Sequence, residues 1–479
     1  MKMNYKTWKW TLTILTLVAL GCTSAIRAQE PETQAQPKPA GRGIPSVDDT
    51  NSQDANDLQS GWTPDTMPLT GLQSPSVGSP VSRHSYWVPG LQYSSTIQNQ
   101  PSSGGTSGSW YSNNYFGANL SLLQQWTRSQ LTLNYSGGGI VTTQSGQNNG
   151  WYQQLALGQN IVWERWQLQI LDQFAYLPES QFGFGVGTGL ALPGIGGSLG
   201  PTVPGIGSAV TPGQSIYATI GPRYSNAFVG QLTYQISRRS SVTFGGSYGL
   251  LRFTEAGNVD TTNYIGNAGY NYQLTKNNSI GLAYRFTAYH YQGEPQAIGD
   301  QLISFSFGRK ITKRIGLQLY GGPDITSFRV PVNNQKQTIA GSGGASLNYA
   351  FQRGSLSLSY FHGLTGGSGV LIGSNTDQVT IGGSRQLNRL WSINGNFGFG
   401  ANRPLANQTG ITGNDYNSIY VGGGVARPIG RNFNFSASYT AQIQKANATV
   451  CTGTGCNASS TQNIITISLQ WHTRPFVLE

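Results

Sequence analysis

The stretch RNFNFSASYTAQIQ, residues 431–444, places large apolar and small polar side chains at alternating positions. Phe433, Phe435 and Tyr439 belong to one set of positions, and Asn434 and Ser438 belong to the other. Successive side chains of a β-strand point to opposite faces, so this stretch has one apolar and one polar face. Segments with the same alternation recur from about residue 86 to the end of the chain.

The composition narrows what these strands can build. Charged residues make up 10% of the 479 residues, whereas soluble domains carry about 25%. Beyond the N-terminus the chain has no run of about 18 apolar residues, which excludes helical membrane spans. A membrane protein with few charges but no long apolar run can cross the bilayer with alternating strands, because polar side chains separate the apolar ones that face lipid. The sequence predicts an all-β fold, a transmembrane antiparallel β-barrel with lipid outside and a polar lumen.

The N-terminal 85 residues differ from the rest. Residues 1–28 have the basic start, apolar core and small residue before a cut that define a signal peptide. Cys22 leaves a lipidated form as an alternative. Residues 29–85 are rich in Pro, Gln, Ser and Asp without periodicity, which predicts a disordered acidic periplasmic segment. The predicted barrel covers residues 86–476.

The strands can be counted from eight very short connections. These centre on Arg128, Glu164-Arg165, Arg238-Arg239, Lys276-Asn277-Asn278, Lys313-Arg314, Arg353-Gly354, Asn388-Arg389 and Gly430-Arg431. Each joins two strands, and one further strand is predicted at each end, near residues 87–98 and 463–472. The total is about 18 strands, an even number as bacterial barrels require. Pro89-Gly90 interrupts the first strand, so 16 strands is the alternative.

Longer connections alternate with the short turns. They are expected at residues 99–113, 178–214, 256–263, 292–299, 329–337, 364–376, 402–417 and 445–462. With this architecture the chain resembles a Gram-negative outer-membrane β-barrel of the porin-like kind. The resemblance implies short turns toward the periplasm, a cell outer membrane location, and contacts with outer-membrane lipid and the barrel-assembly machinery. A homo-oligomer is left open. Many such barrels end in a terminal Phe, whereas here Phe476 precedes Val-Leu-Glu.

The connection at residues 178–214, which we take as the third long loop and call the third long connection, has no charged residue from Ser180 to Gly221. In porins the third loop typically folds inward and narrows the pore, and an apolar loop also fits a partner surface. The candidate constriction or plug residues are Phe182, Phe184, Leu190, Leu192, Ile195, Leu199, Val203 and Ile206.

Every short turn carries Arg or Lys. These form a predicted periplasmic basic rim of Arg128, Arg165, Arg238, Arg239, Lys276, Lys313, Arg314, Arg353, Arg389 and Arg431. Such a rim can pair with inner-leaflet phosphates or attract residues 29–65. The alternative is that these residues are simply soluble turn anchors.

The predicted lumen is mostly Ser, Thr, Asn, Gln and Gly, with Arg285 as one of few inward charges. A wide barrel with such a wall suits passive diffusion of small hydrophilic, neutral solutes. Two alternatives remain open. One is a polysaccharide-export barrel with periplasmic partners, and the other is a closed structural or adhesive barrel acting through its loops.

The remaining chemistry-bearing residues are few. Cys451 and Cys456 lie in one long loop of an oxidising compartment, which predicts a disulfide. The four His residues have no metal-ligand spacing, and no Ser/His/Asp arrangement can be recognised. We expect no catalytic site, no cofactor and no metal, and no nucleic-acid partner despite the basic composition.

Overall fold

A computed structural model gives the arrangement of residues 85–99, 109–143, 149–177, 223–254, 259–312, 314–332, 334–366, 371–405, 416–446 and 459–478. All of them belong to one compact unit, Thr50–Glu479. Within these residues, no helix is long and apolar enough to span a membrane. The predicted signal peptide, Cys22, the predicted periplasmic segment before Ser85, and the third long connection lie outside the described residues.

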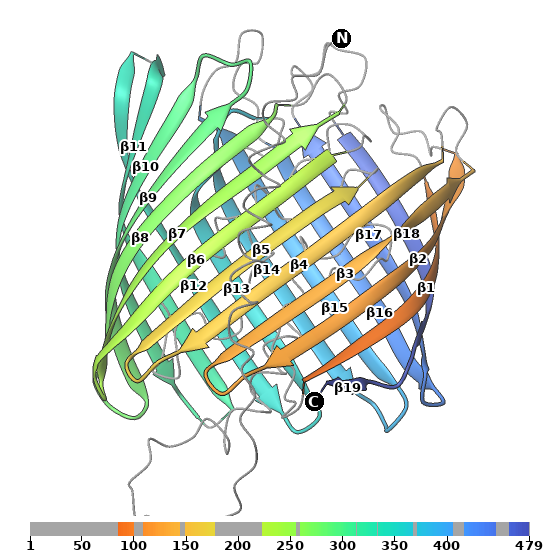
Figure 1. Ribbon diagram of the computed structural model, residues 1–479. Helices are drawn as coiled ribbons and strands as arrows, with labels where there is room; N and C mark the ends of the chain where they lie inside the picture. Colours follow the sequence, from red (N-terminus) through yellow and green to blue (C-terminus); the bar gives the residue numbers. More distant parts are fainter. Residues whose placement is uncertain are drawn as a thin grey trace, which may run out of the picture. The chain divides into compact units, whose positions relative to one another are not determined.

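The described residues form one antiparallel sheet (Figure 1). Its strands are β1 (Ser85–Asn99), β2 (Trp110–Gln125), β3 (Ser129–Thr142), β4 (Gly150–Val162), β5 (Trp166–Leu177), β6 (Arg223–Ser237), β7 (Ser240–Phe253), β8 (Thr261–Gln273), β9 (Asn278–Tyr291), β10 (Ala297–Lys310), β11 (Ile315–Val332), β12 (Gln335–Phe351), β13 (Gly354–Thr365), β14 (Ser374–Gln386), β15 (Ser392–Pro404), β16 (Tyr416–Ile429), β17 (Phe433–Ala446), β18 (Ser459–His472) and the short β19 (Phe476–Leu478). Each long strand pairs with its sequence neighbours, and β1 pairs with β18, so eighteen long strands close a barrel. The predicted fold class and the count of eighteen are confirmed.

All eight predicted short turns join the strands that the sequence indicated. Side chains in these turns replace missing backbone partners. Asn388 Oδ1, for example, accepts hydrogen bonds from the backbone N–H groups of Leu390 and Trp391, both at 2.8 Å. Such local bonds are why Asn, Ser and Thr favour turns. We call this edge of the barrel the short-turn end and the opposite edge the long-loop end.

Two predictions about the long-loop end are wrong. A ninth connection, residues 143–149, joins β3 to β4, whereas only eight long connections were expected. The expected long connection at 329–337 is a tight turn between Val332 and Gln335. Asn334 turns the chain there with a φ of 65°, a conformation that Asn tolerates better than most residues. The end of this hairpin carries exposed charged residues such as Arg329 and Lys336, which is why the segment resembled a loop.

The first strand runs without a break through Pro89. Pro89 pairs with Leu120 of β2, and its carbonyl accepts a hydrogen bond from Thr473 N at 3.1 Å. The amide nitrogen and carbonyl of one strand residue point to the same side, so the N–H that proline lacks faces the interruption between β18 and β19. Proline is tolerated where a ladder is already interrupted.

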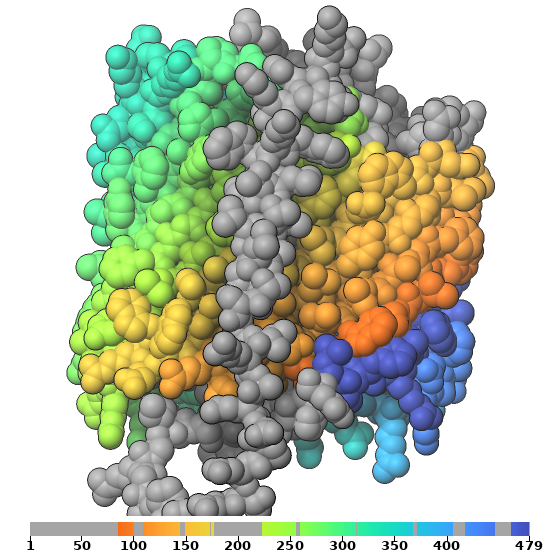
Figure 2. Space-filling model, in the orientation of Figure 1, coloured from red at the N-terminus to blue at the C-terminus, as the bar shows by residue number. Residues whose placement is uncertain are grey.

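The chain beyond β18 also belongs to the barrel wall. β19 pairs with Ser85–Trp87 of β1 and ends past the predicted limit of residue 476. Its Phe476 ring stacks on the Trp87 ring with centroids 4.9 Å apart. Figure 2 shows the dark blue C-terminal segment lying along the orange start of β1. The last residues therefore help to close the seam between first and last strands.

Candidate functional site: the inner wall

The two faces of the sheet differ in chemistry as the alternation predicts. On β9 the side chains of Leu282, Tyr284 and Phe286 are exposed, whereas Arg285 and Thr287 at the alternate positions are buried. The exposed side chains form the outer face, because they are large and apolar on strand after strand. The buried polar side chains form the inner face.

Hydroxyl and amide groups of the inner face are bonded across strands. Gln92 Nε2 of β1 donates hydrogen bonds to Tyr152 Oη at 2.9 Å and to Ser136 Oγ at 3.2 Å. Thr376 Oγ1 of β14 donates to Asn402 Oδ1 of β15 at 2.9 Å. Such bonds hold inward side chains in fixed positions, so this part of the wall is an ordered polar surface.

Charged side chains are few on this inner wall, and three of them lie close together. Arg285 of β9 pairs in register with Leu302 of β10, which pairs with Asp324 of β11. Asp300 of β10 lies two residues before Leu302 and also faces inward. Arg285 Nη2 donates to Asp300 Oδ2 at 3.3 Å. We name Arg285, Asp300 and Asp324 the inner charge cluster.

The inner charge cluster has more acceptors than its one guanidinium satisfies. Arg285, Asp300 and Asp324 are all buried, with 9%, 1% and 3% of their surface exposed. Arg285 Nε, Asp300 Oδ1 and Asp324 Oδ1 have no hydrogen-bond partner. Buried polar groups in folded proteins are nearly always bonded. One guanidinium can pair fully with only one of the two carboxyl groups, so the cluster offers unpartnered carboxyl oxygens to a cation or to the amino group of a solute.

The sequence identified Arg285 but not its acidic neighbours. Asp300 and Asp324 each occupy an inward position of their strands, so the alternation alone places them in the lumen. The missing information was the register of β9, β10 and β11, which brings the three side chains together.

An apolar group lies next to the inner charge cluster at the long-loop end. Its buried members are Tyr289, Tyr291, Ile298, Phe328, Leu364 and Ile372, which we name the mouth cluster. Tyr289 follows Arg285 on the same face of β9, four residues nearer this end. The mouth cluster therefore lies between the inner charge cluster and the long-loop edge of the wall.

The mouth cluster joins distant strands. Ile372 comes from the connection between β13 and β14, while Tyr289 and Ile298 come from β9 and β10. A Cβ on Gly366, at the start of the same connection, would lie 3.0 Å from Tyr289 Cε1. Since β10, β11 and β12 separate β9 from β13 in the sheet, Gly366 and Ile372, described residues at the two ends of this connection, lie over the inner wall. Burial of six apolar side chains holds them there.

The other predicted site residues are placed as follows. Phe182, Phe184, Leu190, Leu192, Ile195, Leu199, Val203 and Ile206 lie outside the described residues, as do Cys451, Cys456 and Lys313. The nine described members of the basic rim are all exposed and lie in the short turns. In the described part of the chain, no group of three His, Cys, Asp or Glu side chains could hold a metal ion.

A closed barrel of eighteen strands with an apolar outer face and a polar inner face is a porin-like barrel of the outer-membrane type. No family profile and no curated protein matches the chain. Solved structures with a similar fold include two Pseudomonas aeruginosa proteins. OpdQ is 10% identical, with a TM-score of 0.41 over 81% of this chain and 98% of its own. The outer membrane protein opdK is 10% identical, with a TM-score of 0.43 over 81% and 99%. A BenF-like porin from Pseudomonas fluorescens Pf-5 is 10% identical, with a TM-score of 0.42 over 82% and 99%.

Proposed function

We propose that this protein is a channel of the Gram-negative outer membrane for passive diffusion of small hydrophilic, mostly neutral solutes. The observation that carries the proposal is the ordered hydroxyl and amide surface on the inner face of a closed barrel. Uncharged solutes with several hydroxyl groups can exchange their water hydrogen bonds for bonds to this wall at little cost. The short turns then face the periplasm and the long-loop end faces outward.

The inner charge cluster and the mouth cluster set the selectivity of this channel. The excess carboxylate favours cations over anions weakly, because most of the wall is neutral. The connection that carries Ile372 covers part of the wall at the outer end, so it limits the size of solutes that reach the inner charge cluster. Residues 182–210 of the third long connection are proposed as a second constriction.

Planar-bilayer conductance of the refolded protein tests the channel. We expect steady ion conductance that sugars reduce when they are added as blockers. A form lacking residues 182–210 should conduct more than the full-length chain if that connection narrows the pore. Equal conductance of the two forms would reject the proposed constriction but not the proposed channel.

A closed structural barrel is the second candidate, and the mouth cluster is the observation that favours it. Buried apolar side chains that tie β9 to the connection between β13 and β14 would also seal the outer end. If neither the full-length form nor the shortened form conducts ions, the channel is rejected and this second function is favoured.

A further inference from the structure

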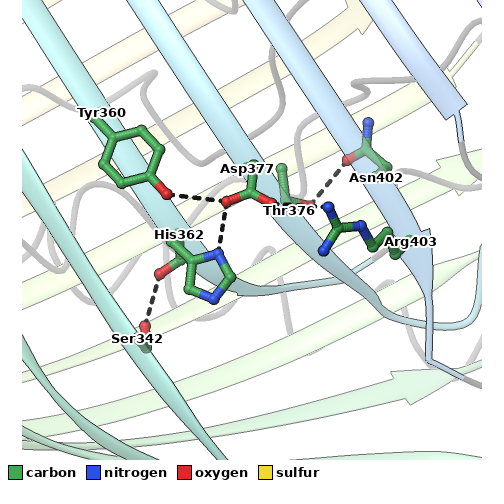
Figure 3. A network of polar contacts seen from close by, with 7 residues as sticks. All are labelled: Ser342, Tyr360, His362, Thr376, Asp377, Asn402 and Arg403. Atoms are coloured by element: carbon green, nitrogen blue, oxygen red, sulfur yellow. Dashed lines mark hydrogen bonds and ion pairs between the residues drawn. The ribbon is translucent and has the colours of Figure 1, made fainter.

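Four polar side chains interrupt the apolar outer face near the long-loop end. Tyr360 and His362 belong to β13, Asp377 belongs to β14 and Arg403 belongs to β15 (Figure 3). We name them the outer-face cluster. Charged groups on a lipid-facing surface are costly at the hydrocarbon level, which makes such a cluster a candidate for a function.

The alternation of the strands places the cluster outside the barrel. Leu356, Leu358 and Tyr360 are exposed at successive outward positions of β13. On β14 and β15 the neighbours of opposite parity, Thr376 and Asn402, are buried and bonded to each other on the inner face. His362, Asp377 and Arg403 therefore share the face of the leucines.

Asp377 holds the cluster together. Its Oδ1 accepts a hydrogen bond from the Tyr360 hydroxyl at 3.0 Å and lies 2.7 Å from His362 Nδ1. Its Oδ2 lies 3.7 Å from Arg403 Nη2. One carboxylate thus positions an imidazole and a guanidinium on two different strands, as Figure 3 shows.

The cluster keeps donors available. The Arg403 side chain is 59% exposed although one of its nitrogens faces Asp377. A guanidinium has five N–H groups, and His362 engages Asp377 through Nδ1, so Nε2 remains available. These are the donor types that bind phosphate through charge-assisted hydrogen bonds.

The position of the cluster fits a lipid headgroup. Toward the short-turn end, the outer face of the same strands carries Leu356, Leu358 and Ile381, which match hydrocarbon. The outer-face cluster follows directly: His362 lies three residues before the end of β13, Asp377 three residues after the start of β14, and Arg403 one residue before the end of β15. This is the level at which the acyl chains give way to headgroups.

We propose that the outer-face cluster binds the phosphorylated headgroup of an outer-leaflet glycolipid. Arg403 and His362 contact the phosphate, and Asp377 holds both side chains in position. The acyl chains of the same lipid lie along the apolar rows of β13–β15. The proposal depends on the orientation of the barrel in the outer membrane but not on whether the barrel conducts.

Binding of lipid A, a bisphosphorylated glycolipid, to the detergent-solubilised full chain tests the proposal. The variants are the double change Arg403→Ala with His362→Ala, the conservative change Arg403→Lys, and Lys445→Ala as a matched control. Lys445 is another exposed outward cation at the long-loop end, on β17. Native mass spectrometry reports bound lipid and oligomeric state in one experiment, and heat-modifiable gel migration shows that each variant is folded.

We expect the double variant to bind lipid A about tenfold more weakly, which corresponds to the loss of charge-assisted bonds. Arg403→Lys should retain part of the affinity, and Lys445→Ala should bind like the wild type. Removal of the phosphates from the lipid should weaken wild-type binding to the level of the double variant.

Three results would overturn the proposal. Unchanged lipid binding by the folded double variant would show that the cluster does not touch the headgroup. Displacement of the lipid by equimolar inorganic phosphate would show a site for free anions. A change of oligomeric state in the lipid-free double variant would assign the cluster to a contact between copies of this chain.

Discussion

Tyr152 of β4 and Gln92 of β1 are joined by a hydrogen bond of 2.9 Å, although β2 and β3 separate their strands. The Tyr152 side chain reaches this far because it passes over Gly117 of β2, where no side chain obstructs it. The bond ties the first strand to the fourth on the inner face, beside the seam where the barrel closes.

Gly117→Ala should destabilise the barrel. A Cβ at Gly117 would meet the Tyr152 hydroxyl and lie 2.8 Å from the Gly137 carbonyl oxygen. Overpacking of this kind costs about 1–3 kcal/mol. The free energy of unfolding in urea, measured in lipid vesicles, is the test. Gly230→Ala is the control, because nothing lies within 4 Å of a Cβ there. Equal stability of the two variants would contradict the packing of Tyr152 on Gly117.

Phe476→Ala should weaken the seam between β1 and the end of the chain. The stacked pair of Trp87 and Phe476 contributes about 0.5–1.5 kcal/mol beyond its buried area. We therefore expect a lower temperature of heat-induced unfolding, seen as a shift in gel migration. Val477→Ala serves as the control, because Val477 is 63% exposed. A similar loss in both variants would mean that the ring pair has no special role.

Asp324→Asn should make the pore less selective for cations. The change removes one of the two carboxyl groups beside Arg285, so the guanidinium then matches the single remaining carboxylate of Asp300. We expect the ratio of cation to anion permeability to fall by about a factor of two, since the charge lies on the inner wall. The reversal potential in a KCl gradient measures this ratio.

Asp172→Asn is the control for this measurement. Asp172 accepts a hydrogen bond from Asn226 at 2.8 Å on the outer face, so its removal should leave the reversal potential unchanged. A shift in this variant and none in Asp324→Asn would reject the inner charge cluster as the source of selectivity.

Ile372→Ser should release the connection between β13 and β14. Loss of the buried Ile372 side chain removes about 2–4 kcal/mol of packing from the mouth cluster. We expect larger or more frequent conductance steps in single-channel records, because the released connection moves away from the pore. Ile339→Ser is the control. Ile339 belongs to β12, in the hairpin that β12 forms with β11, and is 70% exposed, so this change should leave the single-channel records unchanged.

Much of the fold could be predicted from local patterns. The basic short turns and the alternation at residues such as Phe433 and Phe435 led to eighteen strands, and the structure confirms this number. The turn between Val332 and Gln335 could not be predicted, because polar strand residues beyond a bilayer resemble loop residues. Pro89 weakened the prediction of the first strand, since its tolerance depends on a ladder that ends at residues far away in sequence.

On the inner wall, too, some features follow from the sequence and others depend on the tertiary structure. Alternation is a property of each strand's backbone, so the sequence by itself determined that Arg285 faces the lumen and that Leu282 faces lipid. Which inward side chains meet depends on the register between strands and on barrel closure. Only the tertiary structure therefore decided that Arg285 lies beside Asp300 and Asp324, and that Ile372 packs with Tyr289 across three intervening strands.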